Sequence, residues 1–242
     1  MVHIDLIHGF TQDSRVWDRV LEALPSDWSV RPIDLPGHGS NGDMRPRTPD
    51  EFLRLTSELL EGNPEADRRV LCGYSMGGRV ALTLSAATPE QWTDLVVVSA
   101  GVGINGVSER AARREADEFL ATRYLDEGWI EEFASHWDSL SIWDGDPQDV
   151  KQARLAMLLQ QDPEGLAAAL RSFGQGVSPP FDGFGPGGEP SLSVIRGERD
   201  SSYNIPTEQL AMLAGTSPKV VAGSHSLLLE NPGAIAEVIS GL

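Results

Sequence analysis

The 242-residue sequence has a single cysteine and few basic residues, 19 lysines and arginines against 36 aspartates and glutamates. One cysteine excludes an internal disulfide and is typical of a reducing compartment, so we expect a cytoplasmic protein. Cys72 lies within an apolar run, where we expect a buried, unreactive thiol. The formal net charge of −17 repels nucleic acid and anionic membrane surfaces, so we expect neither as a partner.

Other signals are also absent. No apolar stretch is long enough to span a bilayer, and the first residues lack the basic region and apolar run of a signal peptide. There is no glycine-rich phosphate loop, no cysteine and histidine cluster at metal-ligand spacing, and no evident internal repeat. We therefore expect no cofactor and no metal. The length and the 40% content of hydrophobic residues are ordinary for a globular α/β domain.

Short apolar runs alternate with amphipathic stretches in the first hundred residues. Strands are predicted at residues 2–7, 28–33, 69–73 and 95–99, and helices at residues 16–24, 49–60 and directly after residue 75. The strand at 95–99 is an unbroken β-branched run of the kind found inside parallel sheets. This alternation predicts an α/β fold with a doubly wound, mostly parallel sheet.

The alternation stops after residue 103. Residues 104–173 contain no convincing strand, only helical stretches at 109–124, 128–137 and 150–159, and a glycine- and proline-rich loop follows at 177–190. Strands resume at 192–196 and 219–221, and a last helix is predicted at 234–239. We predict an α/β core made of residues 1–103 and 181–242, with residues 104–180 inserted as a helical cap.

A Gly-x-Ser-x-Gly sequence centred on Ser75 joins a predicted strand to a predicted helix. Gly73 and Gly77 allow a strained turn that exposes the serine hydroxyl above the sheet. The first turn of the following helix adds backbone N–H groups and the positive end of its dipole. The alternative is a tight connection with an incidental serine, because glycine and serine are common residues.

Two later residues can activate a serine at this position. Asp200 follows the strand at 192–196 and His225 follows the strand at 219–221, so both fall at carboxyl ends of strands, on the same edge as Ser75. A serine nucleophile needs a base and a third group that orients the base. Taken singly, His225 is explained as a loop histidine and Asp200 as a turn former, and Glu198 competes for the acid role. Together the three predict a catalytic triad.

The loop after the first strand supplies the remaining part of such a site. His8, Gly9 and Phe10 place the backbone N–H of Phe10 where it can lie beside the N–H of Met76. Two such donors form an oxyanion hole, which binds negative charge as it develops in the transition state. We interpret His8 as a residue that braces this loop and not as a second base.

With these residues in place, the chain resembles the α/β-hydrolase superfamily over nearly its full length, in which the triad follows in the same order. Within it, the sequence is most similar to the synthases of menaquinone biosynthesis that form 2-succinyl-6-hydroxy-2,4-cyclohexadiene-1-carboxylate. The matching stretches are HGFT at 8–11 with Trp17, DLPGHG at 34–39, GYSMGGRV at 73–80, the cap residues Arg110, Arg113, Asp117 and Trp137, GERD at 197–200, and His225 with ENP at 230–232.

The chain departs from that family at three places. Residues 99–103 read SAGVG where the family usually has a Ser-Pro-Gly turn, and Ser224 stands where glycine usually precedes the histidine. The run DSLSIW after Trp137 also differs in composition. These departures concern the pocket and the substrate more than the triad.

The resemblance implies a reaction other than hydrolysis, namely removal of pyruvate from an enolpyruvyl ether by 1,4-elimination. Ser75, helped by His225 and Asp200, would act as the base, and the N–H groups of Phe10 and Met76 would hold the oxyanion. The only implied partner is a small-molecule polycarboxylate substrate. An acidic protein that binds such an anion needs a local cationic patch, preferably of arginines.

Several basic residues are candidates for that patch. By resemblance, Arg113 matches the substrate-binding position best and Arg79 is the next candidate, while Tyr74 and Trp137 are pocket walls or hydrogen-bond donors. For Arg110, Arg114 and Arg123 we expect instead a solvated helix face paired with Glu109, Glu115 and Asp117. We also expect a solvated His136.

Two other functions remain open at this point. A hydrolase of the same fold, either a carboxylesterase or a hydrolase of carbon–carbon bonds, would use the same triad and oxyanion hole. A non-catalytic binding protein on this fold predicts a broken triad, and the presence of Ser75, Asp200 and His225 argues against it. The sequence leaves the oligomeric state open between a monomer and a homodimer.

Overall fold

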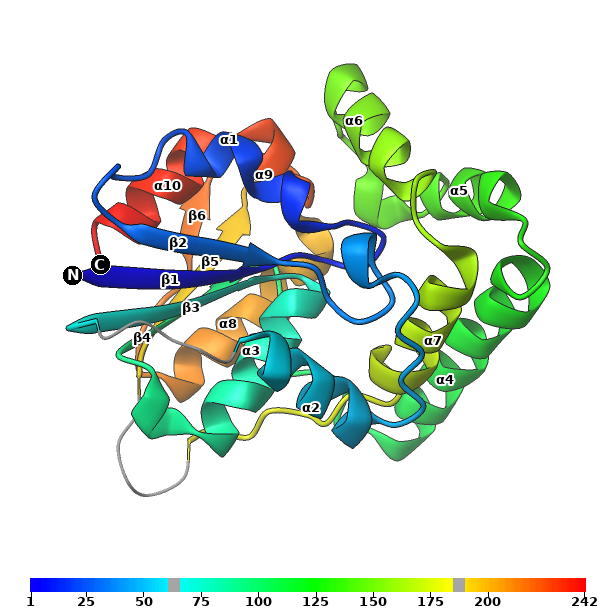
Figure 1. Cartoon of the computed structure of the whole chain (residues 1–242), viewed down its shortest axis with the longest axis horizontal. Coiled ribbons are helices and arrows are strands. Elements are labelled where there is room, and N and C mark those ends of the chain that lie inside the picture. The colour runs from blue at the N-terminus through cyan, green and yellow to red at the C-terminus, as the bar shows by residue number, and fades with distance from the viewer. Residues whose placement is uncertain (61–65, 185–189) are drawn as a thin grey trace.

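One parallel sheet organises the protein (Figure 1). The computed structural model describes residues 1–60, 66–184 and 190–242. Within these residues, six strands pair in parallel in the order β2-β1-β3-β4-β5-β6. They are β1 (Val2–Ile7), β2 (Ser29–Ile33), β3 (Arg68–Tyr74), β4 (Asp94–Val98), β5 (Ser191–Gly197) and β6 (Lys219–Val221). The predicted α/β fold with a parallel sheet is therefore confirmed.

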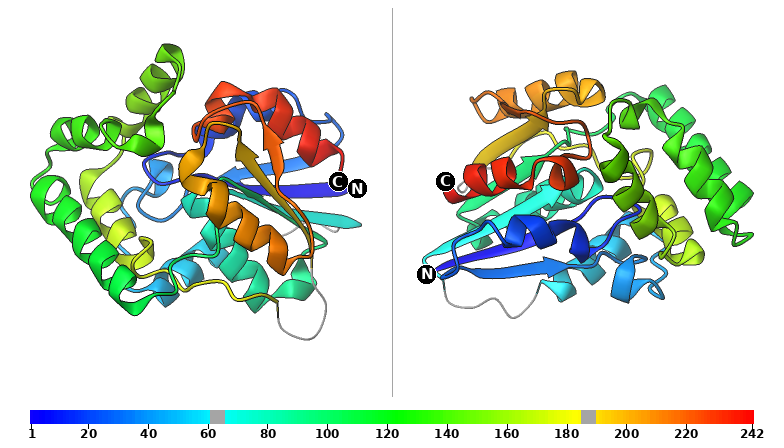
Figure 2. Two further views of the ribbon diagram at one scale, coloured as in Figure 1. Left: turned by 180° about the vertical axis from the view of Figure 1, so that it is seen from behind. Right: turned by 90° about the horizontal axis from the view of Figure 1, so that it is seen from above.

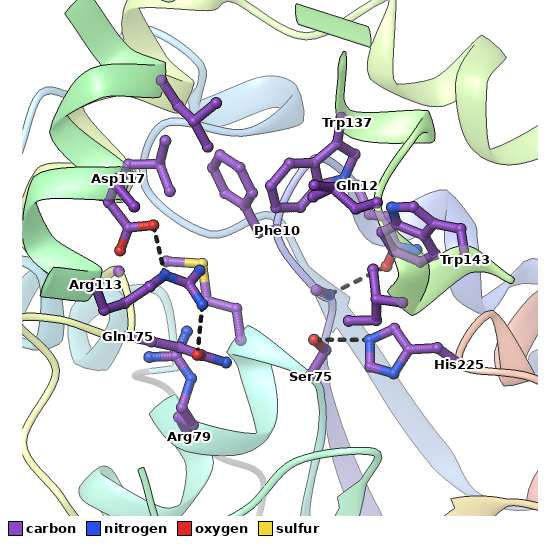
Figure 3. Close-up of a pocket in the computed structure, with 18 of the residues that line it drawn as sticks. Phe10, Gln12, Ser75, Arg79, Arg113, Asp117, Trp137, Trp143, Gln175 and His225 are labelled. Atoms are coloured by element: carbon purple, nitrogen blue, oxygen red, sulfur yellow. Dashed lines mark hydrogen bonds and ion pairs between the residues drawn. The ribbon is translucent and has the colours of Figure 1, made fainter. Parts of the chain in front are cut away.

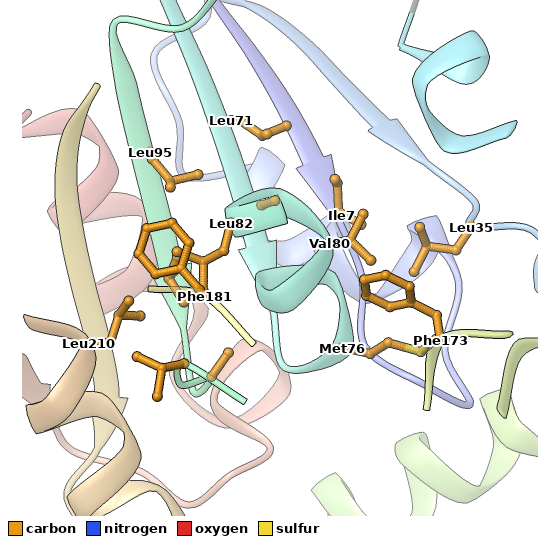
Figure 4. Packing of buried hydrophobic residues seen from close by; sticks show 14 of the residues in the cluster. Ile7, Leu35, Leu71, Met76, Val80, Leu82, Leu95, Phe173, Phe181 and Leu210 are labelled. Carbon is orange, nitrogen blue, oxygen red and sulfur yellow. The ribbon is translucent and has the colours of Figure 1, made fainter. Parts of the chain in front are cut away.

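Helices cover both faces of the sheet. Helices α1 (Asp18–Leu21), α9 (Leu227–Glu230) and α10 (Pro232–Ser240) lie on one face, and α2 (Pro49–Leu59), α3 (Met76–Ala87) and α8 (Asn204–Leu213) lie on the other (Figure 1). Each face has its own cluster of buried apolar side chains. Figure 4 shows the cluster between the sheet and α3, to which β3 contributes Leu71 and α8 contributes Leu210. Burial on both faces explains why β4 is apolar at consecutive positions.

The order of the strands creates a crevice beside β1. The chain passes from β1 to β2 on one side, then returns to form β3 on the other side of β1. The segments that follow β1 and β3 therefore diverge at their carboxyl ends, which is where ligands bind in open α/β sheets. This arrangement brings the loop of Phe10 next to Ser75.

Among the described residues between β4 and β5, four α-helices lie over the carboxyl ends of the strands (Figure 2). They are α4 (Val107–Leu120), α5 (Ile130–Asp138), α6 (Gln148–Leu158) and α7 (Pro163–Phe173). These helices share a buried apolar cluster, but α7 also packs on the core: Phe173 stacks on Phe52 of α2, with ring centroids 5.0 Å apart. The division at residues 104 and 180 stays a prediction, since α7 contributes to both layers.

The first predicted helix is shorter than expected. In place of the helix predicted at 16–24, the structure has a 3₁₀ turn at Ser14–Trp17 followed by α1, which ends at Leu21. Pro25 disfavours helical geometry at the preceding residue, and the N–H of Ala23 bonds instead to the carbonyl of Val20 at 3.0 Å. Helix α2 is capped by Thr48, whose side chain accepts from the N–H of Glu51.

The cap helices also differ in detail from the sequence prediction. The helix predicted at 109–124 is α4 followed by a π-helical turn at Ala121–Leu125, closed by a 2.9 Å bond from the N–H of Asp126 to the carbonyl of Ala121. The sequence pattern did not predict a helix at the positions of α7 and α8. Pro206 lies in the first turn of α8, where proline is tolerated although it weakens the helical signal.

In the glycine- and proline-rich loop predicted at 177–190, residues 177–184 form no regular helix or strand, and residues 185–189 lie outside the described residues. Cys72 is fully buried on β3, as predicted, and burial raises the pKa of its thiol. Of the helices in the described ranges, none has the length and apolar character needed to cross a membrane.

Candidate active site

Ser75 is held in a strained turn between β3 and α3. Its backbone has φ 52° and ψ −112°, a conformation that residues other than glycine rarely adopt. The two flanking glycines are required by close approach: a Cβ on Gly73 would lie 2.2 Å from the carbonyl oxygen of Gly77, and one on Gly77 would lie 2.4 Å from that of His8. The sequence prediction of a sharp turn that presents Ser75 matches this geometry.

The three predicted triad residues come together at the carboxyl ends of β3, β5 and β6. Figure 3 shows the contact between Ser75 and His225. His225 Nε2 lies 3.2 Å from Ser75 Oγ, and His225 Nδ1 lies 2.9 Å from Asp200 Oδ2. Asp200 and His225 are both buried, whereas the competing acid Glu198 is exposed. A carboxylate on Nδ1 favours the tautomer with its proton there, which leaves Nε2 free to accept the serine proton.

Three aromatic rings enclose the imidazole of His225. Tyr203 stacks on it at a centroid distance of 4.9 Å, and Tyr74 and Trp143 each lie 5.4 Å away. The Tyr74 hydroxyl donates to the backbone carbonyl of His225 at 2.8 Å, and burial raises the pKa of Tyr74 well above its usual value. Tyr74 is therefore a permanent donor that fixes the histidine backbone.

The loop after β1 is braced in the way the sequence predicted for His8. His8 Nδ1 donates to the Gly9 carbonyl at 2.7 Å, and His8 Nε2 accepts from the N–H of Leu35 at 2.9 Å. Burial lowers the pKa of His8, which favours the neutral ring that these two bonds require. A further residue, Gln12, accepts from the N–H of Gly9 at 3.2 Å.

The two predicted oxyanion donors come from the loop after β1 and from the first residue of α3. Phe10 follows the braced Gly9, and Met76 begins α3 directly after Ser75. Among the described residues, neither N–H donates to a backbone or side-chain acceptor. Both residues line the same cavity as Ser75. Two free N–H groups beside a serine hydroxyl can stabilise an oxyanion.

A cavity of about 500 Å³ lies between the sheet and the cap. Ser75 and His225 lie in its wall together with Phe10, Tyr74 and Trp137. The Trp137 and Phe10 rings meet edge to face with centroids 5.4 Å apart, and among the described atoms the buried Trp137 indole N–H has no acceptor. The volume suits a ligand of drug size, with apolar walls and a few polar groups.

Two arginines face this cavity from the side opposite His225 (Figure 3). Arg79 donates to the Ser178 hydroxyl at 2.5 Å and to the Phe173 carbonyl at 3.2 Å, and it forms no ion pair with a carboxylate within the described ranges. Burial lowers the pKa of Arg79 to about 10, so the side chain remains cationic at neutral pH. Arg113 donates to Asp117 at 2.8 Å and to Gln175 at 2.6 Å.

The family follows from comparison with known proteins. The chain matches the Alpha/beta hydrolase family over residues 6–238, which is nearly its whole length. This protein belongs to the alpha/beta hydrolase family. The match covers the end of β1, the strands β2 to β6, and the residues of the serine, histidine and aspartate cluster.

Individual relatives within the alpha/beta hydrolase family are more distant. The 2-succinyl-6-hydroxy-2,4-cyclohexadiene-1-carboxylate synthase of Citrobacter koseri is 29% identical over 235 residues, which cover 97% of this chain and 90% of that protein. The structure of MenH from S. aureus has a TM-score of 0.87 at 26% identity, covering 99% of this chain and 92% of that one. A thermophilic esterase from Thermogutta terrifontis has a TM-score of 0.80 at 20% identity, covering 100% and 89% respectively, which is a likeness of fold alone.

Three cap arginines of this alpha/beta hydrolase have partners other than those predicted. Arg110 donates to the carbonyls of Ile104, Val177 and Ser178, and Arg114 donates to that of Gly176. Arg123 lies over the rings of Tyr124 and Trp129. The predicted pairing of these arginines with acidic neighbours on the same helix is therefore wrong. The segment after α7 runs beside α4 and offers carbonyl groups instead.

The sequence also misplaced or missed residues in the cavity wall. His136, expected to be solvated, is half-buried in that wall and stacks on Tyr124 at 5.6 Å. The missed residues are Gln12, Gln175, Trp143 and Tyr203, all of which line the cavity. Glutamine and aromatic residues are common at many positions, so only the three-dimensional arrangement identifies these four. Within the described ranges, no group of three or more histidine, cysteine, aspartate or glutamate residues could hold a metal ion.

Proposed function

We propose that this protein is a carbon–oxygen lyase of menaquinone biosynthesis. It would eliminate pyruvate from 2-succinyl-5-enolpyruvyl-6-hydroxy-3-cyclohexene-1-carboxylate and so form 2-succinyl-6-hydroxy-2,4-cyclohexadiene-1-carboxylate. The observation that carries this proposal is the pair Arg79 and Arg113, which face the cavity of Ser75 in a chain of net charge −17. The names of the relatives from Citrobacter koseri and S. aureus support the same activity.

The two arginines give an acidic protein a local site for a polycarboxylate. Arg79 is held by a hydroxyl and a carbonyl, so its charge is not neutralised by a carboxylate among the described residues. A guanidinium binds a carboxylate through two parallel hydrogen bonds, and a partly desolvated cation binds it more strongly than a solvated one. Phe10 and Trp137 would pack against the carbon skeleton of the ring.

The reaction begins with the triad. His225 Nε2 accepts the proton of Ser75, and Asp200 stabilises the imidazolium that forms. The serine oxygen then removes the ring proton at C2, beside the succinyl carbonyl, and the electron pair is delocalised onto the carbonyl oxygen. The N–H groups of Phe10 and Met76 donate to that oxyanion. One such donor is worth about 3–4 kcal/mol of barrier height.

The second step breaks the carbon–oxygen bond. The carbonyl re-forms, the ring double bond moves from C3–C4 to C2–C3, and a new C4–C5 double bond forms as the enolpyruvyl oxygen leaves C5. The leaving pyruvate enolate takes the proton from the His225 imidazolium. Ser75 retains the proton taken from C2, so the triad returns to its starting state and no water is consumed.

Hydrolysis by the same triad is the alternative function. The contact between Ser75 and His225 also suits attack of the serine oxygen on the carbonyl carbon of an ester or a ketone. The carbon–oxygen or carbon–carbon bond next to that carbonyl then breaks, the leaving group takes a proton from His225, and water hydrolyses the acyl-enzyme. The fold shared with an esterase from Thermogutta terrifontis is consistent with it. A neutral ester, however, would gain nothing from the charge of Arg79, which has no carboxylate partner among the described residues, whereas Arg113 is already paired with Asp117.

The test compares two substrates in two variants. We expect the wild type to release pyruvate from the enolpyruvyl substrate and to cleave a neutral nitrophenyl ester poorly. Arg79→Met should reduce kcat/KM for pyruvate release by about 100-fold or more, corresponding to loss of a charge-assisted bond worth about 3 kcal/mol, and should leave ester cleavage almost unchanged.

Arg123→Met is the matched control, because Arg123 is a cap arginine that packs on rings outside the cavity. It should retain pyruvate release. Efficient ester cleavage without any pyruvate release would overturn the lyase proposal and leave a hydrolase.

A further inference from the structure

A carboxylate of the cap contacts the loop that carries His225. Asp146 lies between Trp143 and α6, and it is almost completely buried. Its Oδ1 accepts from the Ser224 hydroxyl at 2.7 Å, and its Oδ2 accepts from the Ser226 hydroxyl at 2.8 Å. The residues on either side of His225 therefore donate to one carboxylate that comes from a different layer of the molecule.

The same carboxylate is paired with a buried arginine. Arg154 of α6 has a fully buried side chain, and its Nε lies 3.2 Å from Asp146 Oδ2. Its guanidinium lies 4.0 Å from the centroid of the Trp143 ring, and Trp143 is one of the rings that enclose His225. Figure 3 shows Trp143 reaching from the cap to the imidazole. Asp146 and Arg154 thus fix both the backbone and one ring neighbour of the histidine.

Stability alone does not explain this network. A buried ion pair contributes little net free energy of folding, because desolvation of both charges offsets their attraction. Its geometry is specific instead: Ser224 is held by its hydroxyl, His225 by the bond from Tyr74 to its carbonyl, and Ser226 by its hydroxyl. Three consecutive residues are anchored, two of them by the cap. Ser224 can take part only because it is not glycine.

We propose that Asp146 is a positioning residue for His225. It holds the loop at residues 224–226 so that Nε2 of the imidazole faces Ser75, and it links the layer that covers the substrate to the base of the triad. The proposal rests on a catalytic triad and not on which reaction the triad performs, so it applies to elimination and to hydrolysis alike.

The first variant is Asp146→Asn. The two serine hydroxyls donate to different oxygens of Asp146, and an amide replaces one of these acceptors by an NH2 donor. The amide also has no charge with which to form an ion pair with Arg154. Misplacement of a catalytic group by about 1 Å lowers rates by about 100-fold, so we expect kcat to fall by about 10- to 100-fold. KM should change little, because Asp146 is absent from the residues that line the cavity and both cavity arginines remain.

Asp138→Asn is the matched control. Asp138 also pairs with Arg154, at 2.7 Å, but it has no contact with Ser224 or Ser226 among the described residues. We expect its kcat to stay within about two-fold of the wild type. The double variant Ser224→Ala with Ser226→Ala should match Asp146→Asn, and adding Asp146→Asn to it should cause no further loss, since the three residues act as one unit.

The readout does not depend on the natural substrate. A fluorophosphonate reacts with Ser75 when the serine oxygen bonds to phosphorus, fluoride leaves and His225 takes the proton, so its labelling rate reports the triad directly. Asp146→Asn should slow labelling by the same factor as kcat, with thermal unfolding used to confirm a folded protein. If Asp146→Asn does not fold, the serine variants carry the test.

Three results would overturn the proposal: unchanged labelling and kcat in Asp146→Asn, a raised KM with unchanged kcat, or an equal loss in Asp138→Asn. Because labelling is measured without the enolpyruvyl substrate, a slowed labelling rate supports the role of Asp146 even where no pyruvate is released. Failure of the proposed function is thus distinguished from failure of this inference.

Discussion

At the scale of single residues, the side chain of Arg79 lowers the stability of the folded protein but can bind an anionic ligand. Arg79 brings a cation into the cavity wall, where a hydroxyl and a carbonyl are its partners and burial lowers its pKa to about 10. Arg79 is half-buried, and a partly desolvated charge without a carboxylate opposes folding. A bound carboxylate would supply the missing partner. An anionic ligand should therefore bind more tightly to Arg79 than to an arginine that is already paired with a carboxylate of the protein.

This reasoning predicts that Arg79→Met retains or increases stability while it loses activity. The methionine removes the desolvated charge and fills much of the same space, so the free energy of unfolding should stay equal or rise by up to about 2 kcal/mol. Urea denaturation of both proteins measures this difference. A loss of more than about 1 kcal/mol would mean that the guanidinium serves the fold through its bonds to Ser178 and Phe173.

At the scale of elements, short polar contacts fix the loops that follow the strands. Asp34 follows β2 and accepts from the N–H of Ser14 at 2.6 Å and from the N–H of Ser40 at 2.8 Å. Burial raises its pKa, but these bonds outweigh burial and lower the pKa to about 2. The carboxylate thereby joins the loop after β2 to the turn that follows the Phe10 loop.

Asp34 should therefore contribute stability that depends on pH. A carboxyl whose pKa is lower in the folded state stabilises the protein above its ordinary value near 3.8, and this contribution disappears as the pH falls through 2. After a discount for partial exposure, we expect Asp34→Asn to lose about 1–2 kcal/mol at pH 7.

Urea denaturation at pH 7, 4 and 3 gives the stability difference between wild type and Asp34→Asn. The difference should shrink toward low pH, although the amide leaves one of the two N–H donors without an acceptor at every pH. A difference that is constant from pH 7 to pH 3 would show that the charge of Asp34 contributes nothing.

Elements that carry local signals were predictable from the sequence. Ser75, Asp200 and His225 each lie shortly after the end of a strand, and parallel strands bring their carboxyl ends to one edge. Contacts between distant segments were not predictable. Arg110 binds carbonyls almost seventy residues away, and Asp146 binds hydroxyls about eighty residues away. No periodicity or spacing encodes such pairs, which depend on how the cap docks on the core.

At the scale of the whole molecule, the cap and the sheet share apolar contacts. Ala169 and Phe173 of α7 belong to the buried cluster on one face of the sheet, while Leu166 and Leu170 of the same helix belong to the cluster of the cap. The buried network of Asp146 and Arg154 adds a second connection on the other side of the cavity. We do not expect an inserted segment with two such connections to form a separate folding unit.

We therefore predict that cap and core unfold in a single transition. The chain has six tryptophans, of which residues 17, 28 and 92 lie in the core and residues 129, 137 and 143 in the cap. Variants that retain tryptophan in only one layer should give the same urea midpoint by fluorescence, and it should coincide with the midpoint from circular dichroism. Separate midpoints for the two sets would mean that the cap unfolds independently.

The central claim is that Ser75 acts as the base in an elimination, and one measurement tests it most directly. Pyruvate release from 2-succinyl-5-enolpyruvyl-6-hydroxy-3-cyclohexene-1-carboxylate is followed with wild type and with Ser75→Ala, at equal concentrations of folded protein. We predict one pyruvate per cyclohexadiene product with the wild type, and a rate about 10⁴-fold or more lower with Ser75→Ala, as expected when a triad member is removed. Pyruvate release at an undiminished rate by Ser75→Ala, or none by the wild type, would contradict it.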